Sequence, residues 1–203
     1  MGPRAVLRHP AFYSMMTAQC LMSFVIGSVN FHWFSYFTGK GISESSAVST
    51  VAFSAFVSIP VSLVAGFLAE RFHVRYILAA THVGFALVFG LMLFANTVPL
   101  AYLFAFGLGC TSGISFTVGQ IVFADYYGRN SLGAIRGMVA PINSATNALG
   151  PLMAAVAFDL LGNYTLIVVI FAAFSAAAAA LWLISSPPKR PQEVPKVVQG
   201  LPA

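Results

Sequence analysis

Long apolar runs separated by short polar breaks make up most of this chain. Six runs are long enough to cross a bilayer as helices, because about 20 apolar residues span its hydrocarbon core. They cover residues 12–37, 47–69, 75–95, 99–122, 136–158 and 164–185. Membrane β-barrel strands would instead alternate over segments of about ten residues, so the pattern predicts six transmembrane helices.

The polar breaks between the runs have the composition of helix ends. Gly39, Lys40 and Gly41 close the first run, and Ser43 offers an N-cap for the second. After residue 185 the chain becomes rich in Pro, Val and Lys, which is typical of a disordered segment. The pattern predicts three parts: an N-terminal segment 1–11, a six-helix domain 12–185 and a disordered tail 186–203.

The composition places the chain in a lipid environment. Of its 203 residues 59% are hydrophobic and 7% are charged, whereas soluble domains average roughly 45–50% and 25%. A water-soluble surface cannot be built from so few charges. We therefore expect an integral membrane protein whose surroundings are membrane lipid and whose function lies within or across the bilayer.

The positive charges indicate an orientation rather than a nucleic-acid partner. The net charge is +5, but the basic residues are scattered at the edges of the apolar runs and form no basic stripe. If the six helices cross the membrane in alternating directions, Lys40 is the only basic residue on one side of it. The other side receives Arg4, Arg8, Arg71, Arg75, Arg129, Arg136, Lys189, Arg190 and Lys196. By the positive-inside rule, this pattern predicts a cell-membrane protein with both termini in the cytoplasm.

Metal, cofactor and disulfide sites have no sequence support. Cys20 and Cys110 both fall inside apolar runs and belong to no spaced ligand set. An intramembrane serine protease would need a nucleophile with a base in reach. Its nearest candidate, Ser115, lacks the following glycine of that family, and the last two runs contain no histidine. We therefore predict no metal, no cofactor and no enzymatic activity.

The loops between runs resemble those of a known transporter family. Gly66, Glu70, Arg71 and Arg75 fit the acid-arginine loop of the major facilitator superfamily, although His73 stands where that family usually has glycine. Residues 125–137 resemble the later loop of its C-terminal halves. Residues 149–164 are similar to the monocarboxylate and oxalate/formate branch. The order of these segments matches a C-terminal six-helix half.

The resemblance implies a fold and a function. The fold would be an all-α integral membrane unit, a 3+3 inverted-repeat half of a major facilitator fold. The function would be transport of a small solute by alternating access. Superfamily members normally have twelve helices, so we expect a second six-helix half or a homodimer as partner. Alternatively, the chain is a truncated, non-transporting fragment or an accessory membrane subunit.

The resemblance also implies gating residues at the cytoplasmic loops. There, contacts between charged side chains and helix ends would break as the carrier rocks. The alternative role is anchoring of helix ends at the lipid headgroups. The candidates are Gly66, Glu70, Arg71, Arg75, Asp125, Arg129 and Arg136.

Polar side chains on shared helix faces are candidates for the substrate site. At about 100° per residue, Gln19 and Asn30 share one face of the first helix, and Asn143 and Asn147 share a stripe of the fifth. The full set is Gln19, Asn30, Ser112, Gln120, Asn143 and Asn147. Each could equally make an interhelical hydrogen bond. His32 is predicted to pack at the interface, and His82, in the peripheral third helix, receives no role.

The substrate class stays open from sequence. No Asp, Glu, Lys or Arg lies in the middle of a run, although membrane sites for ions usually contain one. Members of the anion-carrying branch place an Arg or Lys in the helices that correspond to the second and fifth here. This chain has no Arg or Lys in the middle of either helix, so a small organic anion would be the substrate only with its counter-charge supplied by a second half.

Overall fold

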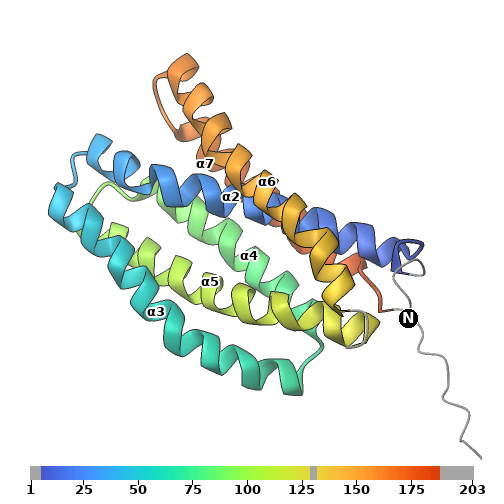
Figure 1. Cartoon of the computed structure of the whole chain (residues 1–203). Helices are drawn as coiled ribbons and strands as arrows, with labels where there is room; N and C mark the ends of the chain where they lie inside the picture. Colours follow the sequence, from blue (N-terminus) through green and yellow to red (C-terminus); the bar gives the residue numbers. More distant parts are fainter. Residues whose placement is uncertain (1–5, 129–131, 188–203) are drawn as a thin grey trace, which may run out of the picture.

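The computed structural model describes residues 6–128 and 132–187, and the long elements in this part are all α-helices (Figure 1). They are α2 (Pro10–Gly39), α3 (Glu44–Arg71), α4 (Val74–Phe94), α5 (Val98–Tyr127), α6 (Leu132–Leu161) and α7 (Thr165–Ile184). All six are long and apolar enough to span a membrane. The six predicted crossings are confirmed, with ends that differ by up to about five residues. The predicted tail from residue 188 onward lies outside the described residues.

Local sequence explains where these helices begin and end. Ser43 caps α3, its hydroxyl accepting a hydrogen bond from the backbone N–H of Ser46 at 3.4 Å, as predicted. Gly41 and Gly128 have φ of 82° at the ends of α2 and α5, where residues with a Cβ are disfavoured. Prolines stand inside α3 and α6 (Pro60, Pro141 and Pro151), where each removes one intrahelical hydrogen bond.

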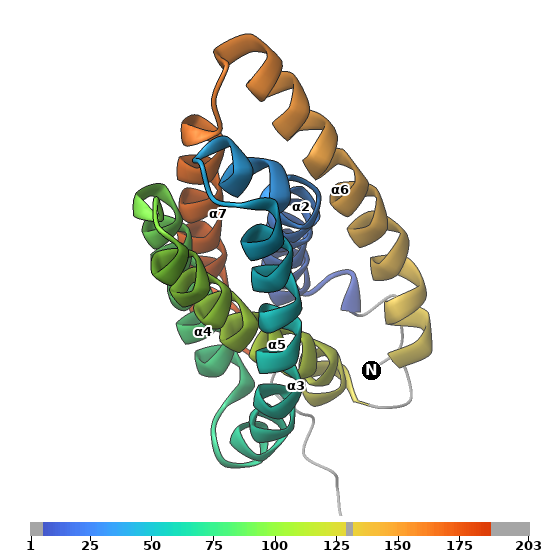
Figure 2. The ribbon, with the colours of Figure 1, turned by 90° about the vertical axis from the view of Figure 1, so that its left-hand side faces the viewer.

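The neighbour relations of the helices have a two-fold pattern. α2 packs along α6 as α5 packs along α3, and α2 contacts α7 as α5 contacts α4. Exchanging α2, α3 and α4 with α5, α6 and α7 therefore maps these four contacts, and that between α4 and α7, onto one another. Because each triplet crosses three times, the two triplets run through the membrane in opposite directions. The all-α six-helix fold predicted from the sequence is confirmed (Figure 2), and the contacts between its helices fit the predicted 3+3 inverted-repeat half.

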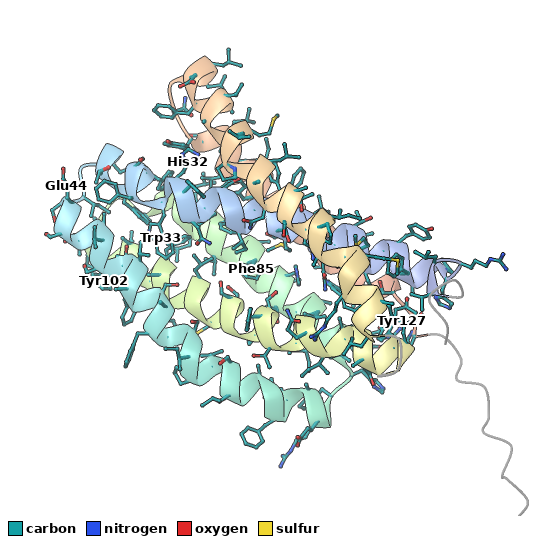
Figure 3. The ribbon with its side chains drawn as sticks, in the orientation of Figure 1. His32, Trp33, Glu44, Phe85, Tyr102 and Tyr127 are labelled. Carbon is teal, nitrogen blue, oxygen red and sulfur yellow. The ribbon has the colours of Figure 1, made fainter. Side chains whose placement is uncertain are left out.

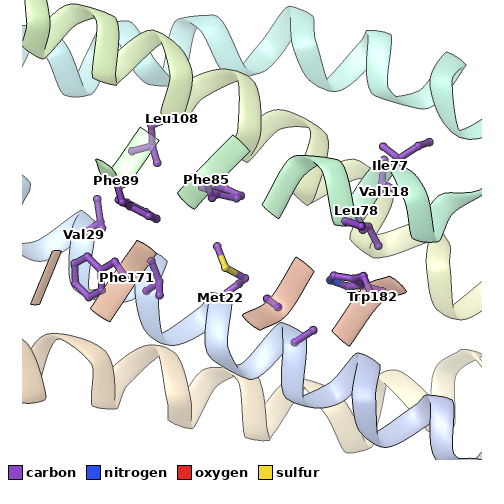
Figure 4. Close-up of a cluster of buried hydrophobic side chains, with 14 of the residues drawn as sticks. Met22, Val29, Ile77, Leu78, Phe85, Phe89, Leu108, Val118, Phe171 and Trp182 are labelled. Carbon is purple, nitrogen blue, oxygen red and sulfur yellow. The ribbon is translucent and has the colours of Figure 1, made fainter. Parts of the chain in front are cut away.

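The apolar core lies between α2, α4, α5 and α7. Its fully buried members include Phe104 on α5. They also include Phe85 and Phe89 on α4 and Trp182 on α7 (Figure 4). In the most apolar stretch of α4, 50% of the residues are buried inside the chain, whereas for both α3 and α6 the share is 11%. α3 and α6 therefore present most of their surface to the surroundings.

Polar contacts join the helices at the end of the bundle away from the termini. Trp33 donates from its indole nitrogen to the Thr50 hydroxyl at 3.1 Å, linking α2 to α3 (Figure 3). The Lys40 ammonium donates to the carbonyl of Leu93 at 2.7 Å and lies 4.8 Å from the centre of the Tyr36 ring. Burial lowers the pKa of Lys40. Its charge lies at the C-terminal end of α4, where the helix dipole favours a cation.

Candidate functional site

A cavity of about 430 Å³ lies between α2, α5 and α6 and is backed by α4 and α7. We call the end of the bundle where α2 begins and α7 ends the terminal end. The cavity extends from near this end to about the middle of the bundle. Pockets that bind small molecules usually measure about 300–1,000 Å³. The cavity is therefore large enough for a small solute.

Five of the six predicted substrate residues line this cavity. They are Gln19 on α2, Ser112 and Gln120 on α5, and Asn143 and Asn147 on α6. Asn30 is exposed and is not part of the wall. It shares a helical face with Gln19, but eleven residues separate the two by roughly 16 Å along the axis. A shared face therefore places two residues in line without placing them in one cavity.

The two asparagines of α6 also hold that helix against α2. The side-chain nitrogen of Asn143 donates to the Gln19 side-chain oxygen at 3.1 Å, and that of Asn147 donates to the Ser23 carbonyl at 3.0 Å. The Cys20 thiol lies 3.7 Å from the Asn143 oxygen. Each asparagine thus lines the cavity and forms an interhelical hydrogen bond, and its substrate-binding role stays a prediction.

Two glycines allow α2 and α6 to approach this closely. A Cβ on Gly27 would overlap the backbone oxygen of Asn147, and a Cβ on Gly150 would overlap that of Phe24. The symmetry-related pair α3 and α5 shows the same feature, because a Cβ on Gly109 would lie 2.6 Å from the Ser54 oxygen. Small residues at such crossings let membrane helices pack at short range.

Arg136 is the one charged side chain on the described cavity wall. It stands in the second turn of α6, and its guanidinium donates to the backbone carbonyl of Gln120 on α5 at 3.1 Å. It therefore links α5 to α6 at the terminal end of the cavity. The sequence predicts only a gating role for Arg136. The structure also places its side chain on the cavity wall, where a guanidinium attracts anionic groups.

His82 and Trp182 form the inner wall, and both were missed by sequence reasoning. His82 on α4 is 2% exposed and Trp182 on α7 is 1% exposed, with ring centres 6.2 Å apart. The signal available in the sequence was a lone histidine inside an apolar run. This signal predicts no role, because the resemblance places the third helix of a half at the periphery.

The other gating candidates lie at the surface of the terminal end. Glu70 and Arg71 are exposed, and neither forms an ion pair within residues 6–128 and 132–187. Arg75 donates to the Tyr76 hydroxyl at 2.6 Å and to the Ser186 hydroxyl at 3.3 Å, joining α4 to the end of α7. The remaining candidates are Gly66, which faces open space, Asp125, which is exposed near the end of α5, and Arg129, which lies outside the described residues. Their gating role stays a prediction.

His32 is held at the end of the bundle away from the termini (Figure 3). One ring nitrogen lies 3.0 Å from the Pro151 carbonyl and the other 3.2 Å from the Tyr164 hydroxyl. Burial, and the nearby Asp159 carboxylate, raise the pKa of Tyr164. His32 thus joins α2 to α6 and to the loop before α7, in agreement with the packing role predicted for it.

The match to a family model settles which protein class this fold belongs to. The model described as Major Facilitator Superfamily matches residues 15–202, which is most of the chain. The chain belongs to the major facilitator superfamily. Members of this superfamily are transporters rather than enzymes. No curated protein matches the chain. Within the described residues, no group of three or more His, Cys, Asp or Glu side chains could hold a metal ion.

Proposed function

We propose that this chain is one half of a secondary transporter that carries a small solute across the cell membrane by alternating access. The observation that supports the proposal most strongly is the polar cavity between α2, α5 and α6 in a chain of this superfamily. Amide and hydroxyl groups on the wall of a cavity within a membrane-spanning bundle can contact water or a polar solute.

We further propose that the solute is a small organic anion, as in the monocarboxylate and oxalate/formate branch that residues 149–164 resemble. Arg136 supplies a positive charge on the cavity wall, and no acidic side chain opposes it among the described lining residues. Neutral donors, such as the side-chain amide of Gln120 and the hydroxyl of Ser112, would complete the coordination. This arrangement favours an anion over a cation.

The transporter would be completed by a second six-helix half or by another copy of this chain. α3 and α6 are the least buried helices, and the α6 residue Ser144, which does not line the cavity, is exposed. Polar groups facing lipid are costly, so a protein partner is the more favourable neighbour. With both termini in the cytoplasm, the terminal end of the cavity would face inward, and Arg136 would stand at its cytoplasmic mouth.

Uptake by purified protein in proteoliposomes tests this proposal. The chain would be reconstituted alone and with any six-helix chain that co-purifies, and then tested with radiolabelled monocarboxylates, dicarboxylates and neutral sugars. We expect saturable uptake of at least one carboxylate. A chain that stays monomeric and shows no uptake of any solute would instead support a non-transporting fragment or accessory subunit.

Replacing Asn147 with leucine is expected to abolish this uptake while membrane insertion remains normal. The substitution removes an amide from the cavity wall and the hydrogen bond to the Ser23 carbonyl; the same is expected for Asn143→Leu. Thr146→Val is the matched control, because Thr146 does not line the cavity and its hydroxyl bonds to two carbonyls of its own helix. It contacts α2 through a side-chain hydrogen bond with the Cys20 thiol. Uptake by Asn147→Leu equal to that of the control would remove Asn147 from the site.

A further inference from the structure

The inner wall of the cavity contains a hydrogen-bond acceptor with no partner in the described residues. The Nδ1 atom of His82 lies 2.6 Å from the Leu78 carbonyl. A carbonyl oxygen only accepts, so Nδ1 carries the proton. Burial among apolar helices opposes a charged ring, which leaves Nε2 as a bare lone pair. His82 lines the cavity, so this lone pair is available to a donor within it.

Next to it stands a hydrogen-bond donor with no partner. The indole Nε1 of Trp182 is buried and makes no hydrogen bond to any described residue. Trp182 also lines the cavity and stacks at a tilt on His82. Figure 4 shows it in the interior together with Leu78, Phe85 and Met22, which belong to the same wall. Leaving a buried N–H without a partner costs about 1–3 kcal/mol, so buried donors usually have a hydrogen-bond partner.

We propose that His82 and Trp182 form a hydroxyl-binding subsite on the inner wall of the cavity. One hydroxyl group there accepts from the Trp182 Nε1–H and donates to the His82 Nε2. A hydroxyl is the smallest group that does both. The hydroxyl belongs either to a resident water or to the transported solute, and the second source rests on the proposed function. A solute bound in this way would extend from Arg136 at the mouth to a hydroxyl contact at the inner wall.

The N–H stretching band of the Trp182 indole tests the subsite in the full chain. Infrared difference spectra between wild type and Trp182→Phe in lipid nanodiscs isolate this band. The chain contains two tryptophans, and Trp33 bonds to Thr50 at 3.1 Å, so its band is an internal reference for a bonded indole. We expect the wild-type Trp182 band in the bonded range. In His82→Phe we expect it in the free range, because this variant keeps an aromatic ring but removes the nitrogen that holds the hydroxyl group beside the indole.

Spectra recorded in buffer alone, with acetate and with glycolate separate the two sources of the hydroxyl. A bonded band without added solute assigns a resident water. A band that is free in buffer and with acetate, but bonded with glycolate, assigns a solute hydroxyl, because glycolate differs from acetate by that group. A free band under all three conditions, or a bonded band that persists in His82→Phe, would overturn the subsite.

The histidine tautomers give a second measurement that needs no variant at His82. In ¹⁵N spectra the structure requires His82 to be protonated at Nδ1 and His32, whose Nε2 faces the Pro151 carbonyl, to be protonated at Nε2. Protonation of His82 at Nε2 would contradict the subsite even if His82→Phe fails to fold. Neither measurement requires transport, so a chain without uptake can still bind the hydroxyl, and a transporting chain can still lack the subsite.

Discussion

Arg136→Gln is expected to reduce uptake of an anionic solute about 10- to 100-fold, mainly by raising KM. The guanidinium is the one charged group on the described cavity wall. Hydrogen bonds to charged groups contribute about 1.5–3 kcal/mol, and each 1.4 kcal/mol is a factor of ten in affinity. The measurement is concentration-dependent uptake in proteoliposomes by wild type and variant.

Arg136→Lys separates this binding role from the contact with α5. Lysine keeps the positive charge but loses the planar fork of donors. If Arg136 acts through its charge, the lysine variant retains most of the uptake that glutamine removes. Equal losses in both variants would assign Arg136 to the bond with the Gln120 carbonyl and would remove the electrostatic argument for an anionic solute.

Gly150→Ala is expected to destabilise the chain by about 1–3 kcal/mol, a typical cost of overpacking. The new methyl group would overlap the Phe24 carbonyl oxygen and lie 2.7 Å from the Ser28 hydroxyl oxygen. Because backbone atoms cannot move aside as a flexible side chain can, α2 and α6 must separate. Thermal unfolding in detergent measures the effect, at about 2–4 °C per kcal/mol for a chain of this size.

Gly137→Ala on the same helix is the matched control. A Cβ at Gly137 would meet no atom within 4 Å, and alanine is the better helix former by up to about 1 kcal/mol. The two substitutions should therefore change the unfolding temperature in opposite directions. A Gly150→Ala variant as stable as Gly137→Ala would show that α2 and α6 do not pack as closely as described.

The helices could be predicted from sequence because both of their determinants are local. The length of an apolar run sets a crossing, and caps such as Ser43 set its end. The polar stripe of Asn143 and Asn147 was also predictable, because helical periodicity places both residues on one face. Asn30 shows the limit of this reasoning, since periodicity fixes the direction of a side chain around the axis but not which neighbouring helix stands beside it.

The inner wall could not be predicted because it depends on tertiary packing. His82 and Trp182 are a hundred residues apart and come together only because α4 packs along α7. Either residue alone is an ordinary member of an apolar helix. The sequence predicts that Arg136 lies beside a loop, but its place on the cavity wall depends on how α6 lies against α5. Chemistry shared between distant helices is therefore the part that sequence patterns leave open.

The most direct test of the account compares two thiols on α5 at nearly the same depth. Ser112 lines the cavity, whereas the native Cys110 does not. Two residues rotate the helix by about 200° and advance it by only about 3 Å. With Cys20 replaced by alanine, one variant keeps Cys110 and the other carries Ser112→Cys with Cys110→Ala. Both are exposed in native membranes to a charged, water-soluble methanethiosulfonate.

We expect the thiol at position 112 to react and Cys110 to stay unmodified, because only the first would meet water. Equal reactivity of the two, or reaction at Cys110 alone, would contradict a water-accessible polar cavity between α2, α5 and α6.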